Sequence, residues 1–261
     1  MAAKEHGRPL THRQSSPFLD RSSFVLTMLD RGGKRYAYIV IPFSASFHAE
    51  FREASLRHKW AAESLLGLVR KASQNGANGW ILDIRGNRGG YLAPMLAGLY
   101  SLLGDGNVLE LHGPDSTNIW SIKGSKVVNR SGFQRVSVEE MTDETPQANE
   151  HDAPVVILLD RNTESAAESL AIAFQGRPRT LFIGERTAGL TTSGFYWDLS
   201  DGAVLSIMSQ EVRDRRGRTY PEDIEPSIRV ADPSTPTAIS KDPAIRKGIT
   251  WLSTDSRVTM E

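Results

Sequence analysis

The sequence predicts an α/β fold in which helices flank a largely parallel sheet. Short apolar runs indicate buried strands because they are too brief for helices, and they span residues 35–41, 79–84 and 154–159. A pattern with helical spacing or composition follows each run, over residues 49–74, 91–103 and 165–174. Strand, helix and strand in succession favour right-handed parallel crossovers. At 261 residues the chain can bury a sizeable core in one large domain or two small ones.

The N-terminal part divides into a lead-in and the start of the core. Residues 1–22 are polar and predict an irregular lead-in to a core over residues 23–261. Two β-rich runs flank Gly32 and Gly33, which is typical of a hairpin. Further strands are expected late in the chain, at residues 179–184, 195–199, 203–212 and 228–230, before a helix at 242–252.

The least regular part is residues 104–150. Three short runs there predict strands of a meander or lid, at residues 108–111, 119–122 and 134–138. The acidic stretch that follows them is expected to be solvated. We therefore predict a small β insertion in the core rather than a separate domain.

A serine stands where the apolar run at 154–159 turns into a helix. The first N–H groups of a helix lack partners, and the helix dipole favours developing negative charge there. Ser165 is thus well placed for a nucleophilic hydroxyl. The alternative is structural, because Ser165 and Glu168 have the spacing of a capping box.

A glycine loop follows the run at 79–84. Gly86, Gly89 and Gly90 lack the spacing of a dinucleotide loop, and no Gly-Lys-Ser/Thr follows to make a phosphate loop. One interpretation is tight turning and close packing. The other follows from the parallel sheet, whose loops meet at one edge. The amides of Ala166 and of Gly89 or Gly90 would then form an oxyanion hole, worth about 3–4 kcal/mol per donor.

Four segments, in order, resemble motifs of the tail-specific, or C-terminal-processing, serine peptidases. The first is similar to "DLRGN-x-GG", the second to the nucleophile segment "T-A-S-S/A-x-E", the third to "G-E-x-T-x-G" and the fourth to "G-I-x-P-D-I-x-V". They are residues 80–98, 162–169, 182–189 and 223–230. The Trp80 strand and the run from Pro94 to Gly98 most resemble the branch of the nisin-resistance proteins.

The resemblance implies a fold, an activity and a set of site residues. The implied fold is α/β, with a crotonase-like (ClpP/crotonase-type) peptidase core, a mixed sheet, flanking helices and the small β insertion. The implied activity is that of a serine endopeptidase acting on peptides or unfolded protein. Ser165 would be the nucleophile, with Ala166 and Gly89 or Gly90 as oxyanion donors.

The resemblance leaves open which group activates Ser165. The processing-peptidase branch uses a lysine, and Leu190 stands at that position here. The tricorn-like branch uses a glutamate, and the matching position is Tyr220, with Glu222 and Glu225 nearby. Neither of these two bases is therefore expected.

The nisin-resistance branch takes its base from a histidine upstream of the first core strand. At that distance lies His6, which we predict to form a Ser-His dyad with Ser165. His12 and His48 are the alternatives. His58 is expected on the surface of a helix, and His112 and His151 fall in the irregular part or next to it.

Composition excludes several other classes. Lys+Arg and Asp+Glu are both 31, so no net charge favours nucleic acid or a membrane surface. Cysteine is absent, which removes disulfides and thiolate sites. No His-x-x-x-His pair or acidic cluster suggests a metal, and we expect no cofactor.

Location and assembly are less constrained by the sequence. No membrane-length apolar run or signal peptide is visible. As written, the chain is expected to be cytoplasmic. The family it resembles is often exported, so a lost or uncalled N-terminal segment is the alternative. The oligomeric state has no sequence signal.

Two other functions fit parts of the same sequence. A peptide-binding pseudo-peptidase would keep the cleft without the chemistry, and the missing lysine and glutamate motivate it. A crotonase-like acyl-group enzyme would share the core and the oxyanion site, but its coenzyme-binding pattern is not visible.

Overall fold

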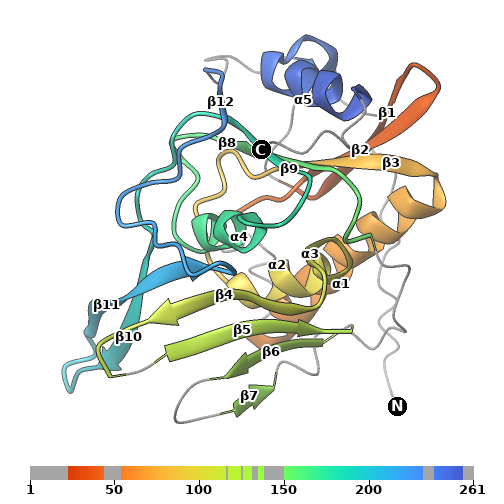
Figure 1. The fold of residues 1–261 in the computed structure, drawn as a ribbon. Helices are drawn as coiled ribbons and strands as arrows, with labels where there is room; N and C mark the ends of the chain where they lie inside the picture. Colours follow the sequence, from red (N-terminus) through yellow and green to blue (C-terminus); the bar gives the residue numbers. More distant parts are fainter. Residues whose placement is uncertain are drawn as a thin grey trace, which may run out of the picture.

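The computed structural model describes residues 23–43, 54–115, 117–124, 126–130, 135–137, 150–231 and 238–254. These residues form two six-stranded sheets with helices between them (Figure 1). A further helix, α5 (Pro243–Ser253), covers the outer face of the first sheet. His6, His12 and His48 lie outside the described residues.

The first sheet carries the parallel core that the sequence predicts. Its strands, in spatial order, are β1 (Val25–Arg31), β2 (Lys34–Val40), β3 (Ala77–Asp83), β8 (Val155–Leu159), β9 (Thr180–Gly184) and β12 (Ile228–Arg229). All neighbours from β2 to β12 pair in parallel. The antiparallel exception is β1, whose predicted hairpin to β2 turns through Gly32 and Gly33 at φ values of 60° and 75°.

Helices α1 (Ala54–Gln74), α2 (Leu92–Gly98), α3 (Tyr100–Leu103) and α4 (Ala166–Phe174) lie between the sheets (Figure 1). The sequence predicts one helix over residues 91–103, and this is wrong. The helix breaks at Leu99, whose φ is −115°. Gly98, a weak helix former, lies so close to α1 that an added Cβ would be 2.6 Å from Leu65 Cβ.

The second sheet is antiparallel and joins two distant parts of the chain. Its strands, in spatial order, are β10 (Thr192–Asp198), β11 (Val204–Asp214), β4 (Gly106–His112), β5 (Thr117–Lys123), β6 (Lys126–Arg130) and β7 (Arg135–Ser137). The sequence did not predict β6. It also did not predict that β4 pairs with β11, which makes the insertion and the later hairpin one structure.

Two apolar clusters hold the first sheet. Trp80, Leu82 and Ile157 face the interior helices, whereas Ile81 and Val156 face α5. These residues are at most 1% exposed, so the sheet is covered on both faces, as parallel sheets require. Among the described residues, no helix has the length and apolarity needed to cross a membrane.

Candidate active site

Ser165 occupies the turn between β8 and α4 in a conformation that side chains seldom adopt. Its φ is 54° and its ψ is −118°. Holding a non-glycine residue there costs about 1–3 kcal/mol. The nucleophile-elbow turn uses this kind of strain to expose a serine hydroxyl. Ser165 is exposed while every residue of α4 is buried, so the turn presents the serine to solvent.

Hydrogen bonds fasten this turn to the glycine loop that follows β3. The buried Asp160 carboxylate accepts the Gly86 N–H at 2.9 Å and the Asn162 N–H at 3.1 Å. The Glu164 N–H donates to Asn87 O at 3.0 Å. Both loops are therefore fixed to each other through the main chain.

The closest approach of the two loops is at Gly89. A Cβ placed on Gly89 would lie 2.9 Å from Ser165 Cβ and 2.8 Å from Glu164 O. Its φ of 97° also favours glycine. The predicted meeting of the glycine loop and the serine turn at one sheet edge is thus confirmed.

The amides beside Ser165 differ in their availability. The Gly89 N–H donates to Asn87 Oδ1 at 2.9 Å. Among the described residues, the amides of Ala166 and Gly90 have no hydrogen-bond acceptor. Ala166 opens α4, and Gly90 is exposed whereas Gly89 is buried. Of the predicted glycine pair, Gly90 therefore offers the uncommitted amide in this conformation.

Glu168 connects the serine turn to the segment after β9 through hydrogen bonds. Its fully buried carboxylate accepts the N–H groups of Ser165, Gly189 and Leu190 at 2.9, 2.9 and 2.8 Å. It also accepts the Thr187 hydroxyl at 2.5 Å. Burial raises the pKa of Glu168, and these four bonds oppose that shift. All four partners donate, which suits the ionised carboxylate.

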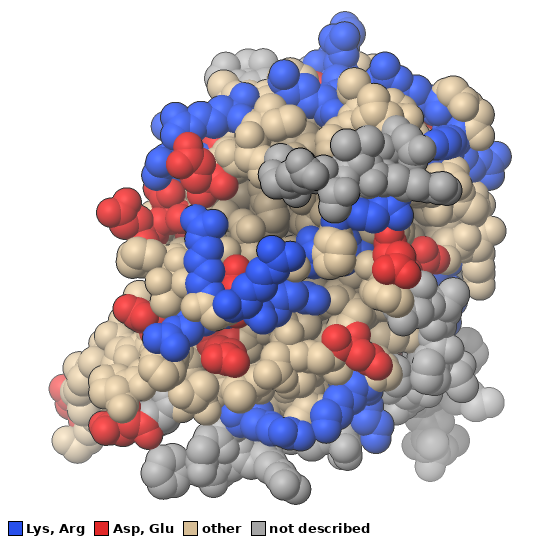
Figure 2. Space-filling model, viewed as in Figure 1, with Lys and Arg blue, Asp and Glu red and all other residues tan. Residues whose placement is uncertain are grey.

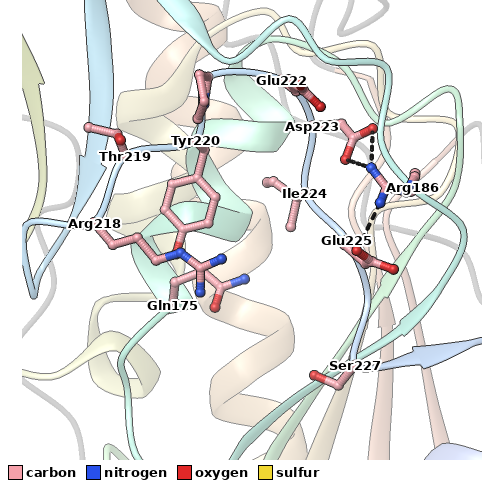
Figure 3. A pocket seen from close by; sticks show the side chains of 11 residues that line it. Gln175, Arg186, Arg218, Thr219, Tyr220, Glu222, Asp223, Ile224, Glu225 and Ser227 are labelled. Atoms are coloured by element: carbon pink, nitrogen blue, oxygen red, sulfur yellow. Dashed lines mark hydrogen bonds and ion pairs between the residues drawn. The ribbon is translucent and has the colours of Figure 1, made fainter.

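A polar pocket of about 310 Å³ is lined by Arg186 of this segment and by residues 218–225 (Figure 3). Arg186 on its wall is already bound to Asp223 and Glu225, each at 2.8 Å. The Ile224 N–H donates to Thr187 Oγ1 at 2.9 Å and so supports the bond from Thr187 to Glu168. Ser165 does not line this pocket. The pocket loop is connected to the site through the hydrogen bonds from Ile224 to Thr187 and from Thr187 to Glu168.

A buried ion-pair cluster anchors the start of the glycine loop. Arg85 is 2% exposed and contacts Asp83 at 2.6 Å and Asp242 at 3.0 Å. Asp242 also caps α5, because its Oδ1 accepts the Ala244 and Ile245 amides. The C-terminal helix is thereby tied to the loop that packs on Ser165.

The positions of the two bases used by other branches hold groups that cannot take a proton. Leu190 has its side chain 54% exposed, and its N–H is bound to Glu168. The Tyr220 hydroxyl donates to Asp214 at 2.8 Å. Burial and that hydrogen bond raise the pKa of Tyr220, so the hydroxyl stays protonated. Lysine and glutamate activation are therefore absent from these positions.

The structure describes three histidines, and none of them hydrogen-bonds to Ser165. The His58 ring on α1 lies 3.8 Å, centroid to centroid, from the Tyr91 ring, next to Gly90. His58 is half-buried rather than on the surface as predicted. His112 Nδ1 lies 3.1 Å from Thr117 Oγ1, and His151 pairs with Asp152 at 3.3 Å.

Charge on the surface is mixed. Figure 2 shows basic and acidic side chains interspersed over the visible face. In the described part of the chain, no group of three or more His, Asp or Glu side chains is arranged to hold a metal ion. The features that distinguish this site are therefore main-chain amides and one strained serine.

The fold and the site define an α/β protein with a serine at a strand-to-helix turn, packed against a glycine loop. The model of peptidase family S41 matches residues 35–230. The chain belongs to this family.

Two curated relatives show how far the similarity extends. The nisin-resistance protein of Lactococcus lactis subsp. lactis is 35% identical over 186 residues, covering 71% of this chain and 51% of that protein. A carboxyl-terminal-processing protease of Synechocystis sp. is 32% identical over 178 residues, covering 68% and 33%. The chain thus spans about half the length of the first relative and a third of the second.

Solved structures support the fold. A lipoprotein from Streptococcus agalactiae matches with a TM-score of 0.61 and 20% identity, over 88% of this chain and 70% of that one. The photosystem II D1 C-terminal processing protease matches with a TM-score of 0.52 and 21% identity, over 83% and 46%. The mixed α/β architecture is therefore that of the family.

Proposed function

We propose that this chain is a serine peptidase that hydrolyses peptide bonds in peptides or unfolded protein. The observation that carries the proposal is the contact of Gly89 with the Ser165 turn, at the strained φ of 54°. It sets an exposed hydroxyl beside main-chain amides, which is the arrangement that acyl transfer needs. Family membership supports the same reaction.

The proposed reaction begins with attack of Ser165 Oγ on the scissile carbonyl carbon while a base takes the hydroxyl proton. The Ala166 amide and a glycine amide, Gly90 in this conformation or Gly89 after a local rearrangement, donate to the oxyanion. The leaving amine takes the proton from the base, and water then hydrolyses the acyl-enzyme.

His6 is the base in this proposal. Two arguments support this assignment: the bases of the other branches are replaced, and the chain is similar to the nisin-resistance protein. Leu190 and Tyr220 replace the bases of the other branches, and the similarity to the nisin-resistance protein favours a histidine from the N-terminal segment. His12 and His48 are the alternatives within the same mechanism.

The proposal extends to the class of fold. The parallel strands from β2 to β12, with α1 and α4 on one face, fit a crotonase-like core. In such a core the loops that follow neighbouring parallel strands share one edge. Those loops here carry Gly89 and Ser165.

Hydrolysis of fluorescein-labelled casein, an unfolded protein, tests the proposal. We expect release of labelled peptides by the wild-type protein and none by Ser165→Ala. Ser169→Ala, one turn further along α4, is the matched control and should retain activity. Equal hydrolysis by wild type and Ser165→Ala would contradict the proposal.

A peptide-binding protein without turnover is the second candidate. The specific observation is that the motif resemblance matches two family bases to Leu190, which cannot accept a proton, and to Tyr220, whose hydroxyl donates to Asp214. If this candidate is correct, wild type and Ser165→Ala should both bind casein and neither should hydrolyse it. The casein assay therefore separates the two candidates directly.

A further inference from the structure

Exposed large apolar side chains concentrate in the segment that begins at Leu190 and continues through the β10–β11 hairpin. Among the described residues there are nine. Seven lie in residues 190–208, and an eighth, Tyr91, directly follows Gly90. The seven are Leu190, Trp197, Leu199, Val204, Leu205, Ile207 and Met208. Grouped apolar exposure of this kind marks an interaction surface.

The same segment supplies a sheet edge. β10 pairs with β11 on one side, and no strand of the described residues pairs with its other side. An open edge offers main-chain groups to an extended chain, and natural edges are often blocked by lysine or proline. β10 contains neither, and its protecting features are a bulge at Ser193–Gly194 and the terminal Asp198. Its seven residues span about 23 Å at about 3.3 Å per residue, enough for a segment of about seven residues.

The edge begins next to the nucleophile. Leu190 and Ser165 donate their N–H groups to the same Glu168 carboxylate, at 2.8 and 2.9 Å. The Thr191 hydroxyl bonds to Tyr220 O and fixes the next residue. β10 then starts at Thr192. A chain paired along β10 therefore leads toward Ser165.

One face of the β10–β11 hairpin offers apolar contacts to such a chain. Trp197 pairs with Leu205, and Ile207 lies two residues along on the same face. These side chains are 45%, 44% and 47% exposed. The charged residues between Leu190 and Met208 are two aspartates, Asp198 and Asp201. The surface thus favours apolar side chains and disfavours acidic ones.

Building on the proposed peptidase function, we propose that β10 and this apolar face bind an extended, non-acidic polypeptide segment. Main-chain hydrogen bonds to β10 would supply its register, and apolar side chains at alternate positions would contact Trp197, Leu205 and Ile207. The continuity of the edge with the serine turn favours substrate over a second copy of the chain.

Fluorescence anisotropy with the Ser165→Ala protein tests the proposal. The probe is a fluorescein-labelled, uncharged peptide with Leu and Val at alternate positions. We expect it to bind, and Trp197→Ser or Ile207→Ser to weaken binding by about tenfold. Leu56→Ser is the matched control, because Leu56 is 49% exposed on α1, and it should leave binding unchanged.

Two probe variants need no change in the protein. N-methylation at one alternate set of peptide amides should abolish binding, whereas methylation of the other set should not, since only one set faces β10. A peptide with Glu at the Leu and Val positions should bind more weakly. Equal binding of both methylated peptides, no binding of the uncharged peptide, or equal losses in Leu56→Ser would overturn the proposal.

The outcomes also separate this proposal from its rivals. A dimer in analytical ultracentrifugation that Trp197→Ser dissociates and the peptide does not would identify a second copy as the occupant and overturn the proposal. Peptide binding to β10 without casein hydrolysis by wild type would contradict the peptidase function alone. Casein hydrolysis with peptide binding unchanged in Trp197→Ser would contradict the docking proposal alone.

Discussion

The serine turn and the β10–β11 hairpin are built in opposite ways. Around Ser165, buried Asp160, Glu168 and Arg85 fix the serine turn and the glycine loop through hydrogen bonds and ion pairs. In the hairpin, residues 204–209 are exposed on both faces of β11. The turn is thus suited to hold a reacting geometry. The hairpin leaves the edge of β10 and an apolar surface accessible to the polypeptide segment proposed above.

The largest effect is expected from loss of the base. His6→Ala should lower kcat for casein hydrolysis by about 10⁴-fold, because the Ser165 hydroxyl would lose its proton acceptor. His12→Ala and His48→Ala serve as controls and should retain most activity. A loss confined to His48→Ala would transfer the role to His48.

The next largest effect concerns the anchor of the glycine loop. Arg85→Met leaves the carboxylates of Asp83 and Asp242 buried and without their cation. It should lower the free energy of unfolding by about 3–5 kcal/mol, measured by urea denaturation. Arg88→Met in the same loop is the control, because its pair with Glu164 is 65% exposed on the arginine side and contributes at most about 1 kcal/mol.

A smaller effect is expected at Glu168. Glu168→Gln keeps the shape but turns an NH₂ group toward amides that also donate. The cost should be about 1–3 kcal/mol of unfolding free energy, with a lower kcat because Ser165 loses its support. Glu185→Gln, in an exposed pair with Arg161, is the control. Unchanged kcat and unfolding free energy in Glu168→Gln would show that the Glu168 carboxylate does not hold the serine turn.

The same residue sets a pH dependence. Burial raises the pKa of Glu168 above its ordinary value of 4.5 in the folded protein, so the folded state retains the proton to higher pH than the unfolded chain. The stability that comes from this retained proton is therefore complete below pH 4.5 and is lost as pH rises through the raised pKa. The unfolding free energy of wild type, relative to that of Glu168→Gln, should therefore fall as pH rises over that range and then level off.

The smallest effect is expected on the hairpin. Val204→Thr changes a side chain that is 58% exposed, and it should alter the unfolding free energy by less than about 0.5 kcal/mol. Urea denaturation checks this. A loss comparable with that of Arg85→Met would show that the hairpin face is covered in the folded protein.

The parts that the sequence predicted depend on short-range pattern. Apolar runs predicted β2, β3 and β8, and parallel pairing then placed Gly89 beside Ser165 because neighbouring loops share an edge. Both steps need only local composition and one general rule of topology.

The parts that it did not predict depend on long-range contacts. The pairing of β4 with β11 joins segments about a hundred residues apart, and periodicity carries no information on such partners. The helix break at Leu99 lies next to the close approach of Gly98 to α1, a contact between segments far apart in the sequence. Likewise, the capping box of Ser165 and Glu168 that the spacing predicts is present, but the bonds of Glu168 to Thr187, Gly189 and Leu190 arise only in the fold.

The most direct measurement is the site of covalent modification by a fluorophosphonate, which reports an activated serine without a known substrate. After reaction and digestion, mass spectrometry should find the phosphonyl group on the peptide that contains Ser165, and Ser165→Ala should remain unmodified. Equal labelling of wild type and Ser165→Ala, or an adduct on another serine only, would contradict the assignment of Ser165 as the nucleophile.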